Sequence, residues 1–497
     1  MNILLLSMPD SFEHMPSLVV RMPNGALTSL AGNVDLHHKV LVADLILVQR
    51  RVRETVARLM REFTPDVVGL SVMTFQRKTA RKIIDLVRSL APAARVTVGG
   101  YDPSLAPDAY TELSGGVDFI VRGEGEITFR ELLRALENRS GFDDIAGLTF
   151  RSGDRFYENQ DRKVSSLNSG EIRPPNRNTR VLRGYTMLGR PVDVIETSRG
   201  CTFDCSFCSI IEMRGRNFHT YTFDRVIADI RDAYDHGARA IFIVDDNITL
   251  NVKRFEALCH AIKDAGLNSI DYTVQAMTSA IANHGESLTR LMHEAGFRYV
   301  FLGIENILEE DLQFLRASSK NASRENGRRV GNATIKAIDY IHRNKMSVVG
   351  GLILGNPGDT RESVEANLEF AKRYVDWPYI QHPTPYPRTP MTKDFRDRGL
   401  IVNERLEEYD GTTAVVRTEH LSAEEVEYMR WRAERRMKSR HMPVALLHNP
   451  LFVLRNATKM LAHTYRGSTV KSLLGLEDER KAFARYRAMR EVERDYV

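Results

Sequence analysis

The sequence predicts an α/β protein with two consecutive domains and a helical C-terminal region. Short apolar runs alternate with segments of helical periodicity over most of the 497 residues, as in parallel sheets covered by helices. This alternation stops at about residue 141 and resumes after about residue 188, which separates two series. Residues 421–497 carry 16 basic and 10 acidic residues, whereas the rest of the chain is nearly neutral.

The first series, residues 1–140, contains five apolar runs that predict buried parallel strands. Apolar residues at helical spacing separate these runs, for example from Ala80 to Leu90 and from Glu126 to Leu136. Strands and helices that alternate in this way form a doubly wound, Rossmann-like sheet, which binds ligands at the carboxyl ends of its strands. The five runs are Ile3–Leu6, Val40–Ala43, Val67–Val72, Val96–Gly99 and Phe119–Val121.

Residues 141–188 do not continue the alternation, and we expect them to link the two domains. Gly153-Asp154 indicates a hairpin. The segment from Arg173 to Arg177 contains two prolines, which favour an extended connection.

The second series, residues 189–400, predicts a partial (β/α)6 barrel, because it holds six strand and helix units and a closed barrel needs eight. Active sites of such barrels lie at the carboxyl ends of the strands. Beyond this domain, residues 401–497 are expected to form a basic helical region. The six strands are expected at 192–195, 240–244, 271–275, 299–303, 348–354 and 379–381.

Composition and patterning favour a soluble cytoplasmic protein. No apolar run approaches the 18 residues of a transmembrane helix, and the first residues lack the basic region and cleavage site of a secretory signal. Four cysteines in a chain of this length do not make a disulfide framework. The basic charge of the tail is expected to be a solvated surface, and no stripe of lysine or arginine interleaved with aromatic residues occurs elsewhere, so we expect no nucleic-acid partner.

Three of the four cysteines, Cys201, Cys205 and Cys208, follow the first barrel strand directly. A structural zinc site requires four ligands, and the sequence has no second pair of cysteines to complete one. A catalytic cysteine requires only one thiol. Three closely spaced thiolates suit a [4Fe–4S] cluster, whose fourth iron then lacks a protein ligand and is open to a small chelating molecule. The fourth cysteine, Cys259, lies on the apolar face of an expected helix and is expected to be a core thiol.

The Cys-x3-Cys-x2-Cys spacing resembles that of the radical S-adenosylmethionine (SAM) superfamily. The resemblance implies that SAM chelates the open iron and that an electron from the cluster cleaves SAM to a 5′-deoxyadenosyl radical. It also implies an electron donor such as flavodoxin or ferredoxin. The cofactors carry the difficult chemistry in such enzymes, and the protein orients them.

Residues that follow the next barrel strands agree with this resemblance. By analogy with the family, Asp246, Gln275 and Glu305 are expected to help seat SAM. For Asp246 and its neighbour Asp245, a pair of helix N-caps is the competing interpretation. Thr384 to Pro390 resembles a sixth-strand motif of the family, but Arg388 replaces its usual glycine, so the shape of that turn stays open.

A doubly wound domain ahead of this barrel resembles the cobalamin-binding subclass of radical SAM enzymes. The resemblance implies that Ser71, Gly99, Gly100 and Glu124 line a cobalamin cleft. Many members transfer a methyl group to an unactivated carbon, here expected on a small-molecule or lipid-like metabolite. Residues 35–40 match only the first half of the motif that supplies a cobalt-ligating histidine, so we expect an ordinary turn there.

Two alternatives remain open at this point. The first is a radical SAM cyclase or coupling enzyme of the same architecture that does not methylate, and the second is a cobalamin or cluster sensor without turnover. Arg199, Arg214 and Arg216 flank the cysteines and either offset negative charge there or are exposed structural residues. An apolar face of the tail either packs on the barrel or makes peripheral contact with a membrane.

Overall fold

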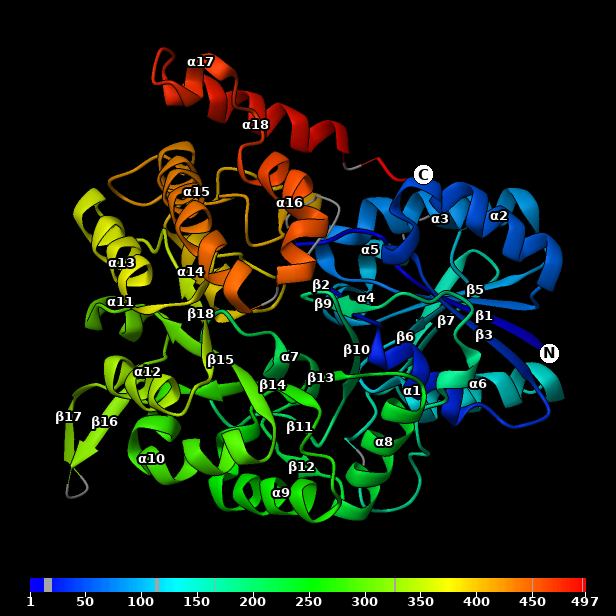
Figure 1. The fold of residues 1–497 in the computed structure, drawn as a ribbon. Coiled ribbons are helices and arrows are strands. Elements are labelled where there is room, and N and C mark those ends of the chain that lie inside the picture. The colour runs from blue at the N-terminus through cyan, green and yellow to red at the C-terminus, as the bar shows by residue number, and fades with distance from the viewer. Residues whose placement is uncertain (13–19, 112–115, 165, 326–327, 449, 494) are drawn as a thin grey trace.

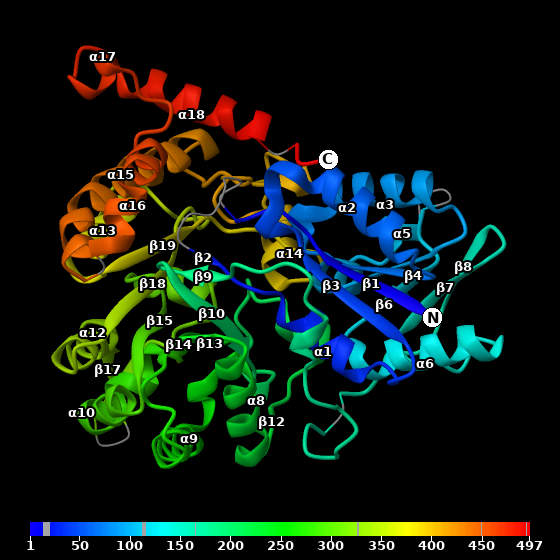
Figure 2. The ribbon, with the colours of Figure 1, turned by 45° about the vertical axis from the view of Figure 1, so that its right-hand side comes forward.

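The computed structural model describes residues 1–12, 20–111, 116–164, 166–325, 328–448, 450–493 and 495–497. Two α/β domains lie side by side, and the C-terminal helices lie along one end of both (Figure 1). This arrangement confirms the predicted fold class. In Figure 2 the first domain, in blue and cyan, lies beside the barrel, in green and yellow.

The first sheet has seven strands in the order β3-β1-β4-β5-β6-β7-β8. Their bounds are β1 (Asn2–Ser7), β3 (Lys39–Asp44), β4 (Val67–Ser71), β5 (Arg95–Gly99), β6 (Phe119–Val121), β7 (Leu148–Ser152) and β8 (Arg155–Glu158). The strands from β3 to β6 are parallel, and the hairpin β7–β8 adds two antiparallel strands at the edge. The hairpin expected at Gly153-Asp154 therefore extends the sheet of the first domain.

Alternation along the central strands produces two cores in this domain. In β1, Leu4 and Leu6 pack with one set of helices, and Ile3 and Leu5 pack with the other. All four side chains are buried because both faces of the sheet are covered. The covering helices are α2 (Val52–Phe63) and α3 (Arg77–Leu90) on one face, and α1 (Gly25–Asn33) and α6 (Gly125–Asn138) on the other.

The second sheet contains the six expected barrel strands, all parallel and in the order β19-β18-β15-β14-β13-β10. Their bounds are β10 (Arg190–Ile195), β13 (Ala240–Ile243), β14 (Asp271–Met277), β15 (Phe297–Glu305), β18 (Ser347–Ile353) and β19 (Trp377–Gln381). The main helices outside this open barrel are α8 (Phe223–Asp235), α9 (Val252–Asp264), α10 (Thr278–Glu294), α12 (Thr334–Arg343) and α13 (Arg361–Tyr374). Cys259 is fully buried in α9, as expected of a core thiol.

The domains exchange short segments at their junction. Strand β2 (Val20–Arg21), which precedes the first-domain helix α1, pairs with β9 (Thr186–Met187) and thereby extends the barrel sheet. Arg177 is buried and binds the carboxylates of Asp193, Asp229 and Asp232 at 3.0, 2.6 and 2.7 Å. The connecting segment is therefore held to the barrel by paired charges.

The C-terminal helices bridge both domains. Arg490 forms ion pairs of 3.2 Å with buried Asp410 and Glu427, which ties the last long helix to the barrel side. Tyr496 and Val497 pack against the core of the first domain under α2 and α3. None of the described helices has the length and apolar composition needed to cross a bilayer. The helices are α15 (Ala423–His448), α16 (Pro450–Thr464), α17 (Val470–Leu473) and α18 (Glu479–Glu493).

Candidate functional site

The cysteine loop begins where β10 ends, at the carboxyl edge of the barrel. Ser198 and Arg199 form a short strand, β11, which pairs with β12 (His219–Thr220) and fixes the start of the loop. Gly200 follows with a φ of +91°, and a Cβ at this position would lie 2.5 Å from the carbonyl oxygen of Asn217. Only glycine fits this turn, which presents Cys201 next to the barrel strands.

The three thiols lie close together, but not as a single-ion site. A zinc ion that binds thiolates at about 2.3 Å holds their sulfurs only about 4 Å apart. Among the described residues, the Sγ atoms of Cys201, Cys205 and Cys208 do not form a set within 4.8 Å of one another. Burial raises the pKa of Cys205, and it raises the pKa of Cys208 to about 12, so metal must displace protons from these thiols. The wider spacing fits a multinuclear iron–sulfur cluster, in which each thiolate binds a different iron.

Lys320 supplies a positive charge beside the three thiols. Its Nζ atom lies 3.2 Å from Oε1 of Glu305, and both side chains are mostly buried. Burial opposes the charge of Lys320, but Glu305 and the three cysteines outweigh this effect and raise the pKa of the ammonium. The lysine is therefore charged at neutral pH and offsets negative charge at the cysteine site.

We expect Lys320→Met to make the reduction potential of the reconstituted cluster more negative by tens of millivolts. A nearby cation stabilises the reduced cluster, which carries more negative charge, and methionine removes that cation. Redox titration followed by electron paramagnetic resonance measures the change. Lys320→Arg keeps the charge and should leave the potential close to that of the wild type. Equal potentials for the wild type and Lys320→Met would contradict the role of the lysine.

Asp245 and Asp246 have different surroundings, and neither caps a helix. Asp245 is buried and accepts hydrogen bonds from the backbone and hydroxyl of Thr197 and from the hydroxyl of Ser198, at 2.5 to 2.6 Å. Asp246 accepts from the backbone N–H of Gly200 at 2.7 Å and from Arg214 at 3.1 Å. Asp245 thus holds the end of β10, while Asp246 lies against the cysteine loop.

Gln275 and Glu305 lie at the same edge of the barrel as the cysteine loop. Gln275 is half-buried in β14, beside β13, whose end precedes Asp246. Glu305 ends β15 with a φ of +59°, a left-handed conformation that aims its carboxylate at Lys320. The structure therefore places Asp246, Gln275 and Glu305 at the carboxyl-terminal ends of three neighbouring strands, and their contact with SAM stays a prediction.

The turn that contains Arg388 keeps the shape of a glycine turn. Arg388 has a φ of +66°, which lies in the left-handed region that glycine adopts without steric cost. Thr389 donates from its hydroxyl to the carbonyl of Tyr386 at 2.8 Å and closes the turn. The departure from the family motif therefore changes the side chain and costs some backbone strain, but preserves the turn.

A cavity of about 240 Å³ lies between the two domains, next to the cysteine loop. Ser71, Gly99, Gly100 and Glu124, the residues expected to line a cobalamin cleft, are all on its wall. They follow β4, β5 and β6, whose carboxyl ends meet at this edge of the sheet. The barrel contributes Glu196, Arg199, Met213 and Arg214.

A buried charge cluster joins the domains at the base of this cavity. Arg199 donates to Glu126 of the first domain at 2.6 Å and to Glu196 at 2.8 Å. Burial alone would raise the pKa of Glu126, but its attraction to Arg199 and its hydrogen bonds to Arg199 and Ser29 lower this pKa to about 2. The interpretation of Arg199 as an exposed residue is wrong, because its side chain is 5% exposed and binds both domains. Arg216, in contrast, is exposed and lies 3.5 Å from Asp204.

The cavity wall suits part of a corrinoid cofactor. Oε1 of Glu124 is buried, lies 3.6 Å from the guanidinium of Arg199 and has no hydrogen-bond partner within the part of the chain that the structure describes. This atom can accept from an amide of the kind that surrounds the corrin ring of cobalamin. The volume is below the roughly 300 to 1,000 Å³ of typical small-molecule pockets, so the closed cavity accommodates only part of so large a cofactor.

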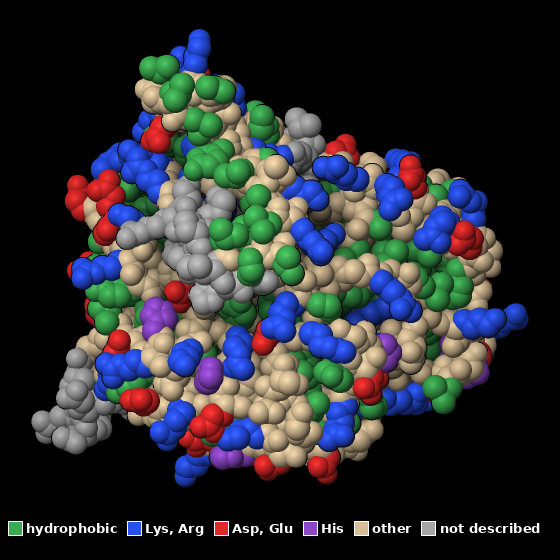
Figure 3. Space-filling model, in the orientation of Figure 1, with side chains coloured by type: hydrophobic (Ala, Val, Ile, Leu, Met, Phe, Trp, Pro, Cys, Tyr) green, Lys and Arg blue, Asp and Glu red, His purple; other side chains and the backbone are tan. Residues whose placement is uncertain are grey.

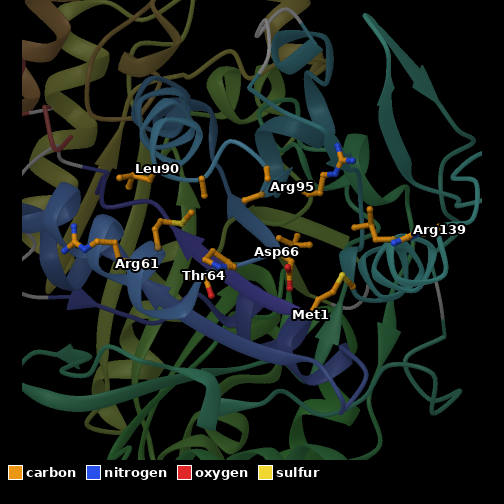
Figure 4. Close-up of a pocket in the computed structure, with 14 residues that line it drawn as sticks. Met1, Arg61, Thr64, Asp66, Leu90, Arg95 and Arg139 are labelled. Carbon is orange, nitrogen blue, oxygen red and sulfur yellow. The ribbon is translucent and has the colours of Figure 1, made fainter.

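Two other features of the first domain lie at the opposite edge of its sheet. His37 and His38 precede β3 and lie near Glu137, which His37 Nε2 approaches to 3.0 Å. A cavity of about 740 Å³ lies at the amino ends of β4 and β5, with Thr64, Asp66 and Arg95 on its wall (Figure 4). Neither feature lies at the carboxyl edge that faces the cysteine loop. The position of His37 and His38 agrees with an ordinary turn before β3.

Sequence reasoning missed Lys320 and Asn24. Lys320 belongs to none of the motifs at the ends of the strands, and only the folded structure brings it near the thiols. Asn24 is the N-cap of α1, where its side chain accepts from the backbone N–H of Leu27. Its Nδ2 also donates to Ser71 in the cavity, at 3.1 Å. An N-cap residue ahead of apolar positions at helical spacing is the signal that identifies this helix.

Comparison with protein families finds both predicted domains. The model of the radical SAM superfamily matches residues 195–371, which hold the cysteine loop and the four barrel strands β13, β14, β15 and β18. The model of the B12 binding domain matches residues 21–133, which hold α1 and the cavity residues Ser71, Gly99, Gly100 and Glu124. Together the two matches cover more than half of the chain.

Curated relatives align over both domains. The chain is 28% identical over 428 residues to an uncharacterized methyltransferase of Pyrococcus horikoshii, covering 86% of this chain and 90% of that protein. It is 29% identical over 350 residues to the hopanoid C-3 methylase of Methylococcus capsulatus, covering 68% of this chain and 62% of that protein.

Solved structures of similar fold hold the implied cofactors. TsrM from Kitasatospora setae, solved with cobalamin and a [4Fe–4S] cluster, has a TM-score of 0.63 at 20% identity. The match covers 80% of this chain and 75% of the TsrM chain. OxsB, solved with aqua-cobalamin and SAM, has a TM-score of 0.64 at 17% identity and covers 99% of this chain and 71% of its own. At these identities the likeness concerns the fold. With both family models matched in one chain, the protein carries a B12 binding domain followed by a radical SAM domain.

Proposed function

We propose that the protein is a cobalamin-dependent methyltransferase that acts on an unactivated carbon of a small-molecule or lipid-like metabolite. One observation carries this proposal. The cavity of the first domain and the cysteine loop of the barrel share a wall, because Glu196, Arg199 and Arg214 line the cavity from the segment that holds the cysteines. A cofactor in the cavity and a cluster on the loop would therefore face a common space between the domains.

Each group of residues has a distinct task in this proposal. Cys201, Cys205 and Cys208 would hold the cluster, and Asp246, Gln275 and Glu305 would help to seat SAM beside it. When bound, the cluster and SAM supply a carbon-centred radical and cobalamin supplies the methyl group. Ser71, Gly99, Gly100 and Glu124 would position the cobalamin, and the buried charges around Arg199 would keep water out of the junction. A flavodoxin or ferredoxin would supply the electrons.

The names of the relatives support methyl transfer rather than one class of substrate. The hopanoid C-3 methylase and a bacteriochlorophyllide d C-8(2)-methyltransferase of Chlorobaculum tepidum, 23% identical over 367 residues, are named for large, mostly apolar substrates. A cytidylyl-2-hydroxyethylphosphonate methyltransferase of Streptomyces wedmorensis, 25% identical over 358 residues, is named for a polar one. Methyl transfer is therefore the common element, and the substrate differs among these proteins.

Isotope transfer tests the proposal. The protein is reconstituted without oxygen with iron, sulfide and cobalamin, and is then incubated with a reductant, SAM labelled in its methyl group and a metabolite extract from a deletion strain. We expect formation of 5′-deoxyadenosine and a labelled product heavier by one methyl group than its precursor. Absence of 5′-deoxyadenosine would contradict a radical SAM enzyme.

Ala26→Trp separates the role of cobalamin from that of the cluster. Ala26 is exposed on α1 and lines the cavity, so an indole there fills the cavity without displacing a core side chain. We expect the variant to lose bound cobalamin and methyl transfer, but to keep its iron and its cleavage of SAM. Ala26→Ser is the matched control and should behave like the wild type. Unchanged cobalamin binding by Ala26→Trp would place the cofactor elsewhere.

A radical cyclase that does not methylate is the second candidate. One relative favours it. An anaerobic magnesium-protoporphyrin IX monomethyl ester cyclase of Cereibacter sphaeroides is 24% identical over 417 residues, nearly as many as align with the methyltransferase of Pyrococcus horikoshii. The same isotope experiment separates the two functions. A cyclase would form 5′-deoxyadenosine without transferring the labelled methyl group.

A further inference from the structure

Apolar side chains are exposed on α16, beside α15, and on the segment around α17, which lies at the end of the molecule farthest from the barrel helices α9 and α10 (Figures 1 and 3). We name these side chains the tail patch. Val470, Leu474 and Leu476 are 73%, 67% and 74% exposed, although burial normally stabilises such side chains. The tail patch consists of Leu451, Leu454, Leu461, Val470, Leu473, Leu474 and Leu476.

The exposure is concentrated in this segment. Of the 17 large hydrophobic side chains that are exposed in the described part of the chain, eight lie between residues 446 and 476. Single exposed leucines are ordinary on a protein surface, but a group of them marks a site of interaction.

The charge of the same segment has one sign. Residues 435–476 contain eight lysine and arginine residues and no aspartate or glutamate. The acidic residues of the tail lie before and after this stretch, from Glu424 to Glu434 and from Glu477 onwards. Any partner of the tail patch therefore meets apolar and positive groups together.

The faces of α16 are arranged for contact in two directions. Val453 and Thr464, eleven residues apart and on the same face, are buried against the rest of the molecule. Leu451, Leu454 and Leu461 lie on a neighbouring face and point to solvent. At about 100° per residue, Arg455 and Lys459 come next around the helix, and both are exposed. An apolar stripe bordered by cations is the pattern of a helix that lies in a membrane interface.

We propose that the tail patch docks the enzyme on the surface of an anionic lipid bilayer. The leucines would enter the boundary between head groups and acyl chains, and the lysines and arginines would contact the negative head groups. A nucleic acid would use the cations but not seven apolar side chains. A second copy of this chain, related by a two-fold axis, would bring two basic segments together. The inference does not depend on methyl transfer and can fail or hold independently of it.

Vesicle flotation of the reconstituted full-length protein tests the inference. The probes are vesicles of phosphatidylcholine alone and vesicles that also contain about one-third phosphatidylglycerol. We expect binding to the anionic vesicles and weakening of that binding as salt increases, because exposed charges are screened. Replacement of Arg455, Lys459 and Lys471 by serine should weaken binding on the order of a hundredfold, since each cation near the surface contributes about fivefold.

The apolar contribution has its own variant and matched control. Serine at Leu451, Leu454, Leu473 and Leu474 should abolish flotation with anionic vesicles while leaving the melting temperature unchanged, because these side chains are exposed. The control, Ile335→Ser with Lys336→Ser, removes an exposed apolar residue and an exposed cation from α12 and should bind as the wild type does. Equal flotation of all variants, no flotation of the wild type, or self-association without lipid that the leucine variant removes would overturn the proposal.

Discussion

Replacement of Cys205 by alanine is expected to abolish both assembly of the iron–sulfur cluster and cleavage of SAM. Cys205 is the most buried of the three thiols, and alanine offers no ligand in its place. The iron content and visible absorbance of the anaerobically reconstituted variant should fall to the level of unreconstituted protein. Formation of 5′-deoxyadenosine under reductant should fall below detection, because Cys201 and Cys208 alone leave one iron of the cluster without its thiolate.

The matched control is Cys259→Ala. Cys259 is fully buried in the core of α9, away from the cysteine loop, so this variant should keep the full cluster and full SAM cleavage. It should lower the free energy of unfolding by on the order of 1 kcal/mol, because it leaves a small cavity. A Cys205→Ala variant that still produces 5′-deoxyadenosine would contradict the assignment of the cluster to this loop.

Replacement of Arg199 by methionine is expected to have the largest effect on stability. The guanidinium is the shared partner of Glu126 and Glu196 and lies 3.6 Å from Glu124, so its loss leaves several buried carboxylates without a cation. Breaking a buried ion pair in this way typically costs about 3 to 5 kcal/mol. Chemical denaturation measures the loss, and limited proteolysis should show earlier cleavage between the domains.

The control for Arg199 is Arg216→Met. Arg216 and its partner Asp204 are both more than half exposed, so removal of this pair should change the free energy of unfolding by less than about 1 kcal/mol. A loss of similar size in the two variants would show that the charge cluster does not hold the domains together.

The same charge cluster predicts how stability depends on pH. The pKa of Glu126 is about 2 in the folded protein, below its ordinary value of 4.5, so the folded state favours the ionised form. The contribution, on the order of 3 kcal/mol, is present above pH 4.5 and is lost as the pH falls from about 4.5 to about 2. Arg199→Met should show a weaker dependence in this interval, which denaturation at several pH values would detect.

The strands were predictable from the sequence because each is a local signal. Runs such as Val67–Ser71 and Ala240–Ile243 are buried on both faces and therefore read as continuous apolar segments. Helix α1 was not predicted, because it is short and its ends, Gly25, Gly32 and Asn33, have low helix propensity. It forms nonetheless, because Leu27 and Ala31 pack on β1 from the wall of the cavity, which is a tertiary effect.

The candidate site also has one part that the sequence predicts and another part that depends on the fold. The cysteine loop is contained in eight consecutive residues, and its motif is visible without a structure. The side chains around it come from distant segments: Lys320 lies more than 100 residues after the thiols, and Glu126 lies 73 residues before Arg199. The contact of Lys320 with the thiols depends on the fold of the barrel, and the contact of Glu126 with Arg199 depends on how the two domains dock. No short sequence pattern predicts either contact.

The exchange of segments between the domains has a consequence for synthesis in the cell. Strand β2, made early, pairs with the barrel sheet through β9, whereas Tyr496 and Val497, made much later, pack against the core of the first domain. At about 5 to 20 residues per second, tens of seconds separate translation of that first core from translation of the residues that cover it. During that interval part of the apolar surface of the first domain is exposed to solvent and is accessible to chaperones.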